Sequence, residues 1–178
     1  MNWYALFVEL GKEEVVKKKL DYYFDPETLY SFIPKRKILE RKNGHTSYVI
    51  KKMFPSYVLI RTKMRTEIFH VLQEIEEVHR LLNTGAYFSK DTGVFFSKID
   101  DEEMRVITKL AANNGIVDSS KIYIEGSGVH VESGPLKGLE NSIKKIDRRK
   151  KRAKIKVNFM GKESTFDVSV EISKCKKQ

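Results

Sequence analysis

Residues 52–60 of this chain, Lys-Met-Phe-Pro-Ser-Tyr-Val-Leu-Ile, decide the fold. The apolar and aromatic run that ends this stretch is typical of a buried strand. Pro55 has no backbone N–H, and a proline is tolerated at the entrance of a strand but not in its middle. The stretch therefore predicts a strand over residues 53–61, with the proline at its beginning.

The residues on either side of this strand alternate between strand and helix patterns. The apolar run at 3–9 predicts a buried strand, and Asn43-Gly44 is a strong signal for a hairpin turn, followed by a strand at 46–52. Apolar residues at helical spacing predict three helices, which span residues 12–24, 66–75 and 100–112. One more short strand is predicted at 78–83, between the second and third helices. This order predicts an α+β sandwich, an antiparallel-rich sheet covered by helices.

The last third of the chain has a different pattern. Residues 113–121 are polar and contain glycine, as linkers do. From Gly126 onward only short strands separated by turn signals are predicted, at 128–132, 141–147, 153–159 and 164–172. Regularly spaced short strands are typical of a small β-barrel. We therefore expect an N-terminal domain over 1–112, a linker over 113–125 and a β-barrel domain over 126–178.

Charge is concentrated in the expected barrel. The 178 residues carry a net charge of +10, divided as +3 over 1–112, −1 over 113–125 and +8 over 126–178. A basic excess in one small domain points to a polyanionic partner, most commonly nucleic acid. No run reaches the roughly 20 apolar residues of a membrane span, and the N-terminus has no signal-peptide pattern. We therefore expect a cytoplasmic protein without membrane contact.

Motifs for catalysis, cofactors and metals are absent from the sequence. It contains no Walker loop, no dinucleotide fingerprint and no nucleophile elbow. The single Cys175 excludes an intramolecular disulfide and a cysteine-rich zinc site, and the four histidines are scattered. The acidic run at 100–103 begins a predicted helix, where it complements the helix dipole. The sequence thus predicts a binding protein rather than an enzyme, with no cofactor and no metal.

Four segments together resemble the NusG family of transcription factors. Residues 3–8, Trp-Tyr-Ala-Leu-Phe-Val, resemble the opening of NusG N-terminal (NGN) domains, and residues 52–60 resemble that domain's signature, in which Phe-Pro-Gly-Tyr precedes an apolar strand. Residues 126–138, Gly-Ser-Gly-Val-His-Val-Glu-Ser-Gly-Pro-Leu-Lys-Gly, resemble the KOW motif, and Asn-Phe-Met-Gly-Lys at 158–162 resembles the family's later turn. The resemblance implies an NGN α/β sandwich followed by a KOW β-barrel of the SH3-like type.

The resemblance also implies partners. NusG-family N-terminal domains bind the clamp helices of RNA polymerase beside the DNA channel, and the KOW domain recruits a ribosomal protein, a termination factor or RNA. Two departures suggest a specialised paralogue: Ser56 replaces the usual glycine of the signature, and Leu136 replaces the phenylalanine that follows Gly-Pro in housekeeping members. We expect the chain to act as a monomer.

Among specialised paralogues the chain looks most like LoaP, the antiterminator of long biosynthetic operons, whose members recognise a hairpin in the nascent leader RNA. Three other interpretations remain open. The first is a housekeeping NusG that couples polymerase to the ribosome or the termination factor, and the second is an RfaH-like or capsule-operon antiterminator. The third is a stand-alone KOW-type protein that binds RNA or assists ribosome assembly, which has no need of the N-terminal signature.

Aromatic residues are the candidates for polymerase binding, because a surface that grips exposed helices is usually anchored by aromatics in desolvated pockets. Tyr4, Phe54, Tyr57 and Phe88 are these candidates. Each of them could equally be a core residue. Trp3, Phe7 and Val58 alternate with some of them and are expected in the core.

A dense basic run between two predicted strands is the candidate for RNA binding. Its residues are Lys144, Lys145, Arg148, Arg149, Lys150, Lys151, Arg152 and Lys154. So many charges cannot be packed inside, although an ordinary solvated turn would also explain them. A second basic stretch comprises Lys35-Arg36-Lys37 and Arg41-Lys42. It could face DNA in the elongation complex, extend the RNA surface, or be a charged strand edge that discourages aggregation.

Overall fold

The computed structural model describes residues 1–83, 88–89 and 93–173. The chain forms two compact units: residues 1–33 and 54–104 make unit 1, and residues 34–53 and 105–178 make unit 2. The fold class is α+β, as predicted. The units do not follow the expected limits of 1–112 and 126–178, because the hairpin within 34–53 packs with the C-terminal residues.

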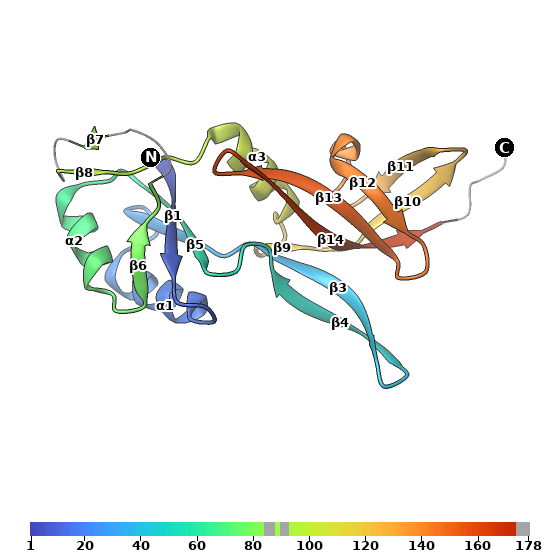
Figure 1. Cartoon of the computed structure of the whole chain (residues 1–178), viewed down its shortest axis with the longest axis horizontal. Coiled ribbons are helices and arrows are strands. Elements are labelled where there is room, and N and C mark those ends of the chain that lie inside the picture. Colours follow the sequence, from blue (N-terminus) through green and yellow to red (C-terminus); the bar gives the residue numbers. More distant parts are fainter. Residues whose placement is uncertain (84–87, 90–92, 174–178) are drawn as a thin grey trace. The chain divides into compact units, whose positions relative to one another are not determined.

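Unit 1 is a four-stranded sheet with two helices against it (Figure 1). Helix α1 spans Glu13–Tyr23 and α2 spans Thr66–Glu74, close to the predicted 12–24 and 66–75. Helix α1 buries Val16 and Leu20, four residues apart on one face, and leaves its lysines at the surface. The strands, in sheet order, are β2 (Leu29–Phe32), β5 (Tyr57–Thr62), β1 (Asn2–Val8) and β6 (Val78–Leu81).

Strand pairing fixes which side chains share a face of this sheet. Tyr4 lies opposite Ile60, and Leu6 lies opposite Val58. All four belong to the buried cluster that also holds the apolar residues of α1 and α2. The alternate residues of β1 must therefore lie on the second face of the sheet, away from these helices.

Unit 2 contains a five-stranded sheet whose alternation supports the predicted barrel. In sheet order the strands are β11 (Gly128–Ser133), β10 (Ser120–Glu125), β14 (Lys162–Ile172), β13 (Arg152–Phe159) and β12 (Ile143–Asp147). A short 3₁₀ helix, η1, spans Glu140–Ser142. Every second residue of β13, from Ala153 to Phe159, is buried, as are Phe166, Val168 and Val170 of β14. This arrangement agrees with the small KOW β-barrel that the sequence predicted.

A second sheet of unit 2 is built on a long hairpin (Figure 1). Strands β3 (Lys35–Lys42) and β4 (His45–Lys52) are antiparallel and joined by the predicted Asn43-Gly44 turn. Both turn residues have positive φ, 51° and 80°, as a type I′ hairpin turn requires. Strand β9 (Ile116–Val117) pairs with β3 only at Lys35 and Arg36.

The expected linker contains two strands. Residues 116–117 form β9, and residues 120–125 form β10 inside the five-stranded sheet. The polar residues around Asp118 gave no strand pattern in the sequence. Ser120 and Ile122 of β10 are nevertheless fully buried, so this part of the chain belongs to the barrel. The remaining elements are α3 (Asp101–Leu110), β7 (Phe88–Ser89) and β8 (Val94–Phe95).

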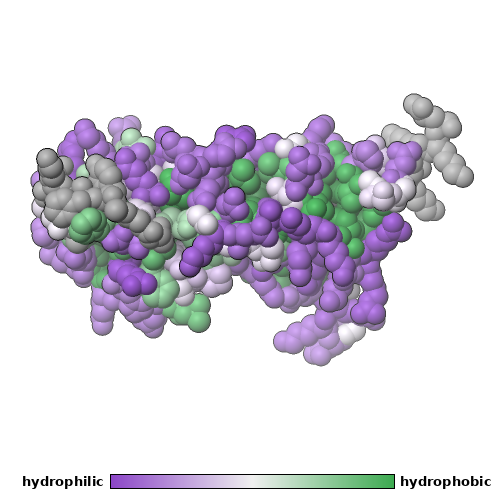
Figure 2. All heavy atoms as spheres, turned by 45° about the horizontal axis from the view of Figure 1, so that its top comes forward, coloured by the Kyte–Doolittle hydropathy of each residue, from purple (hydrophilic) through white to green (hydrophobic). Residues whose placement is uncertain are grey.

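Hydrophilic residues cover most of the face drawn in Figure 2. In the part of the chain that the structure describes, no helix has the length and apolar character to cross a membrane.

Candidate functional site

The densest group of charges lies on the turn that joins β12 to β13. Asp147 and Arg152 are the last cross-strand pair before this turn. The turn is closed by the Lys150 N–H, which donates to Asp147 Oδ1 at 2.8 Å, and this bond lowers the pKa of the Asp147 carboxyl. The turn residues, Arg148, Arg149, Lys150 and Lys151, are all exposed. We call residues 148–151 the basic turn.

Arg152 belongs to the same basic run but has a different environment. Its side chain is only 19% exposed, and its Nε and Nη2 donate to the carbonyl oxygen of Leu39 at 3.2 and 2.7 Å. Carboxylate oxygens of Glu40 and Asp167 lie within 4 Å of the guanidinium. Arg152 therefore joins the basic turn to the β3–β4 hairpin, and its charge is already compensated within the protein.

A groove of about 740 Å³ lies between the β3–β4 hairpin and the basic turn. Arg41 and Thr46, which are cross-strand neighbours, line one wall, and Arg149, Lys150 and Lys151 line the other. Leu39, Glu40 and Arg152 complete it. The two basic stretches of the sequence, about a hundred residues apart, thus meet through Arg41 and the basic turn.

The other basic candidates are separated from this groove. Lys144 and Lys145 are exposed on β12 and line a second hollow of about 540 Å³ together with Arg148. Lys154 is exposed on β13, where it pairs across the strands with Asp167. The eight predicted residues therefore do not form one surface.

Lys35, Arg36 and Lys37 do not form the exposed basic stretch that the sequence suggested. Arg36 shares its face of β3 with the buried Ile38, its Nη1 donates to the Asp167 carbonyl at 2.6 Å, and burial lowers its pKa. Lys37 forms an ion pair of 3.0 Å with Asp118, and this hydrogen bond raises the lysine's pKa. Lys35, like the other two, is only partly exposed. Arg36 and Lys37 are thus bonded within unit 2, which corrects the expectation that this stretch lies free for a nucleic acid.

Two of the four polymerase-binding candidates are buried. Tyr4 is 2% exposed and packs edge-on against Phe96, and Phe54 is 6% exposed. Neither side chain can anchor a partner at the surface, so both assignments are corrected. Tyr57 is partly exposed and remains a candidate. The side chain of Phe88 lies outside the described residues.

The second face of the unit 1 sheet carries the aromatic residues that the sequence assigned to the core. Phe7 lies opposite Tyr57, and their ring centroids are 5.6 Å apart. Trp3 is edge-on to Tyr30, which is 45% exposed. A continuous apolar run such as 3–8 has no alternation to reveal which residues face the helices. The pairing register between β1 and β5 is what identifies them, because residues directly opposite each other on paired strands lie on the same face of the sheet.

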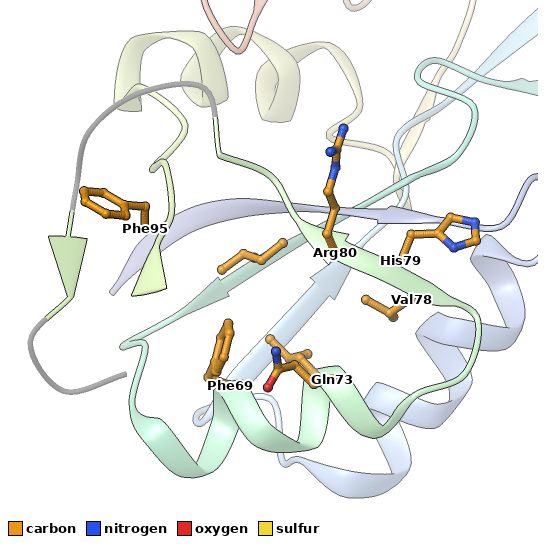
Figure 3. Close-up of a pocket in the computed structure, with 8 residues that line it drawn as sticks. Phe69, Gln73, Val78, His79, Arg80 and Phe95 are labelled. Atoms are coloured by element: carbon orange, nitrogen blue, oxygen red, sulfur yellow. The ribbon is translucent and has the colours of Figure 1, made fainter. Parts of the chain in front are cut away.

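A small pocket of about 260 Å³ lies between α2 and β6 in unit 1. Figure 3 shows Phe69 and Gln73 on α2, Val78 on β6 and Phe95 on β8 at this pocket. The lining is apolar apart from Gln73, His79 and Arg80. The described residues contain no group of three or more metal-ligating side chains, here or elsewhere.

The loop that carries Leu136 is packed against β10. Leu136 is fully buried, and its N–H donates to Ser120 Oγ at 3.0 Å. Gly134 has φ of +97°, and a Cβ there would lie 2.7 Å from the Ser120 Cα. The side chain at position 136 therefore fills the barrel core and does not project as a surface anchor.

Comparison with known proteins agrees with this architecture. Residues 1–108 match the family described as "Transcription termination factor nusG". The "Transcription termination/antitermination protein NusG" of Rickettsia felis is 27% identical over 173 residues, covering 94% of this chain and 86% of that protein. The protein of the same name from Halalkalibacterium halodurans is 24% identical and covers 94% of each chain.

A solved structure shows the same fold. The chain described as "Domain interaction in Thermotoga maritima NusG" superposes with a TM-score of 0.51 at 23% identity, covering 94% of this chain and 93% of that one. The family match spans more than half of this chain and includes both the N-terminal run and the strand after Pro55. The chain belongs to the NusG family of transcription termination and antitermination factors.

Proposed function

We propose that this protein is a specialised antitermination factor of the LoaP type. Unit 1 binds the clamp helices of RNA polymerase, and the basic turn binds a hairpin in the nascent leader RNA. Together these contacts promote readthrough of terminators in long operons. The role places the protein in the cytoplasm, and it involves neither catalysis nor a cofactor.

The basic turn is the observation that carries this proposal. Four consecutive cations are exposed there, and none of them forms an ion pair within the described residues. Neighbouring like charges repel each other, so binding of an anion stabilises the turn by relieving this repulsion. Arginine and lysine together suit phosphate contacts, and structured RNA is read mostly through its backbone and shape.

Polymerase binding is assigned to the second face of the unit 1 sheet. Its candidate anchors are Trp3, Phe7, Tyr30 and Tyr57, which are aromatic and partly exposed. Partly exposed aromatics over a rigid sheet suit the grip on a pair of helices, because such residues bury much area at little cost in side-chain entropy. The proposal keeps the functional division into residues 1–112, 113–125 and 126–178: polymerase binding is assigned to the first segment and RNA binding by the basic turn to the last.

Housekeeping NusG function is the second candidate, because the curated relatives carry the name of the termination/antitermination protein. The environment of Leu136 favours the specialised role. A buried leucine offers no aromatic anchor to a termination factor, and loss of such an anchor can remove a large share of an interface's energy. We therefore expect weak binding to the termination factor. Binding as tight as that of a housekeeping NusG from the same cell would reverse this assignment.

The RNA part of the proposal is tested by charge reversal in the basic turn. Hairpins are first enriched by the wild-type chain from a pool of RNA stems with random loops. The full-length variant Arg148→Glu/Arg149→Glu/Lys150→Glu should then lose binding to the enriched hairpins while its melting curve stays unchanged. The wild-type affinity should fall with salt, with about 0.7–0.9 counterions released per phosphate contact. Wild-type affinity and salt dependence in a folded variant would reject RNA binding by the turn.

Replacement of the arginines by lysine separates two ways of binding. If charge alone matters, the variant Arg148→Lys/Arg149→Lys keeps its affinity for enriched and random hairpins alike. If the arginines make bidentate hydrogen bonds to guanine, this variant loses its preference for the enriched hairpins while its general affinity for RNA remains.

A further inference from the structure

Besides the bond from Arg36 to Asp167, the β3–β4 hairpin is held against the barrel through the backbone of Leu39. Strand β9 pairs with β3 only at Lys35 and Arg36, so the same edge of β3 has no strand partner at Leu39. The Leu39 N–H donates to Ser169 Oγ at 3.0 Å, and its carbonyl accepts the two bonds from Arg152. Ser169 is 1% exposed. These bonds are buried or half-buried, where hydrogen bonds to a charged group are worth most.

This attachment fixes Arg41 relative to the basic turn. Arg41 lies two residues beyond Leu39 on β3, and the basic turn ends at the residue before Arg152. Both walls of the groove are therefore tied to the same pair of partners, Leu39 and Arg152. The exposed cations across the groove share its 740 Å³ space.

The acidic residue in the groove is neutralised by its neighbours. Glu40 forms an ion pair with Lys51 and lies 3.9 Å from Arg152, and the bond from Lys51 lowers the pKa of Glu40. By contrast, Arg41, Arg149, Lys150 and Lys151 form no ion pair in the described part of the chain. The groove thus presents four positive side chains that form no ion pair in the described part of the chain, contributed by both walls.

We propose that one stretch of RNA backbone lies in this groove, contacted by Arg41 on one wall and by Arg149, Lys150 and Lys151 on the other. This inference rests on the proposed RNA binding by the basic turn and extends that site to the β3–β4 hairpin. Arg152 is a positioning residue, because its charge is compensated and its fork holds the two walls together. The lining contains no aromatic ring on which a base could stack, so the groove contacts phosphates and leaves the bases to be read elsewhere.

The test compares single charge reversals in the full-length chain. The probe is a labelled RNA hairpin with a stem of about ten base pairs, long enough to present a run of backbone phosphates. Arg41→Glu should weaken binding as much as Arg149→Glu, by about tenfold or more, and each should reduce the salt slope by about 0.7–0.9. The matched control is Lys162→Glu, which makes the same charge change at the start of β14. Lys162 lies opposite Phe159, the far end of β13, about 25 Å from the basic turn.

The outcomes distinguish failure of the shared groove from failure of the proposed RNA binding by the basic turn. If Arg149→Glu weakens binding but Arg41→Glu behaves like Lys162→Glu, the shared groove is overturned while RNA binding by the basic turn stands. If neither groove variant differs from the wild type, both proposals fail. If all three variants weaken binding equally, a diffuse basic surface replaces the groove. Displacement of the hairpin by polyglutamate as readily as by unlabelled RNA would assign the groove to an acidic protein segment instead.

The role of Arg152 has its own readout. Arg152→Lys keeps the charge but cannot place two donors on the Leu39 carbonyl. If Arg152 positions the walls, affinity should fall about tenfold while the salt slope keeps its wild-type value, since no phosphate contact is lost. A reduced slope would show that Arg152 itself contacts phosphate and would overturn its assignment as a positioning residue.

Discussion

At the scale of single residues, Ser56 shows how a departure from the family pattern is accommodated. It adopts φ of +65°, where the signature usually has glycine, and its N–H donates to Glu13 Oε1 at 2.8 Å. Glu13 is fully buried, so this hydrogen bond is made away from water. The bond fixes the backbone in a conformation that costs a residue with a Cβ about 1–2 kcal/mol.

Replacing Ser56 with glycine should therefore stabilise the protein. The strain is removed, and the greater freedom of glycine in the unfolded chain offsets part of the gain, which leaves about 0.5–1 kcal/mol. Urea denaturation should show a higher midpoint with an unchanged slope. Ser47→Gly, in the middle of the exposed strand β4, is the control and should destabilise. A midpoint for Ser56→Gly at or below that of the wild type would contradict the strain argument.

Asp147 should make the stability of the barrel depend on pH. The Lys150 N–H lowers the folded-state pKa of Asp147 below its ordinary value of 3.8. A carboxyl with a lowered folded pKa stabilises the fold above its unfolded pKa, and this contribution is lost as pH falls through the folded pKa. Asp147→Ala should thus be less stable than the wild type at neutral pH, and the difference should shrink below about pH 4.

The measurement is the free energy of unfolding of both proteins over a pH series. Glu132→Ala removes an exposed carboxylate from β11 and serves as the control for net charge. If the two variants show the same difference from the wild type at every pH, the closing bond of the basic turn contributes nothing.

At the scale of elements, periodicity predicted the helices and the barrel strands well but not the faces of the buried strands. The alternation in β13 marked Ile155 and Val157 as core residues, and both are buried. In β1 every residue from Trp3 to Val8 is apolar or aromatic, so the sequence offers no contrast. The sequence therefore leaves Tyr4 open between surface and core and places Trp3 in the core, whereas Tyr4 is buried and Trp3 is partly exposed. Which face the helices cover depends on cross-strand register, which is a tertiary property.

The contact between β3 and the barrel was also beyond sequence reasoning. Four of its hydrogen bonds use backbone atoms, of Leu39 and Asp167, which any residue type could supply. The charged pattern of Lys35, Arg36 and Lys37 suggested solvent exposure, yet Arg36 lies half-buried beside Phe166, 5.6 Å from the ring centroid. A charge run in a strand predicts a solvated edge only when no other element covers it.

Loss of an aromatic ring from the second face of the unit 1 sheet should weaken polymerase binding, whereas loss of an exposed ring elsewhere on unit 1 should not. Tyr30→Ser removes a 45% exposed ring that stacks on Phe32 at 6.3 Å, and should weaken polymerase binding about tenfold. Tyr22→Ser removes an 85% exposed ring from α1, on the opposite face, and should leave binding unchanged. Binding isotherms with RNA polymerase, paired with melting curves, check both. Equal effects of the two variants would remove this face from the proposed interface.

At the scale of the whole molecule, the chain combines a sheet with partly exposed aromatic residues on one face and a basic barrel. The net charge of +8 in residues 126–178 agrees with the composition of a nucleic-acid-binding module. Part of the charge in the two basic stretches serves the fold: Arg36, Lys37 and Arg152 are bonded within unit 2. The exposed cations that remain include those of the basic turn and Arg41, which line the same groove. The charge count therefore points to the barrel, and only the structure separates the cations bonded within unit 2 from those that face solvent.

Transcription through an intrinsic terminator, on a template whose leader encodes an enriched hairpin, tests the account most directly. The full-length chain should raise readthrough, and only when the hairpin is present. The variant Arg148→Glu/Arg149→Glu/Lys150→Glu should bind polymerase normally yet leave readthrough at the level without factor. Readthrough that is equally high with this variant, or that is lowered by the wild-type chain, would contradict the proposal that the basic turn couples a leader RNA to antitermination.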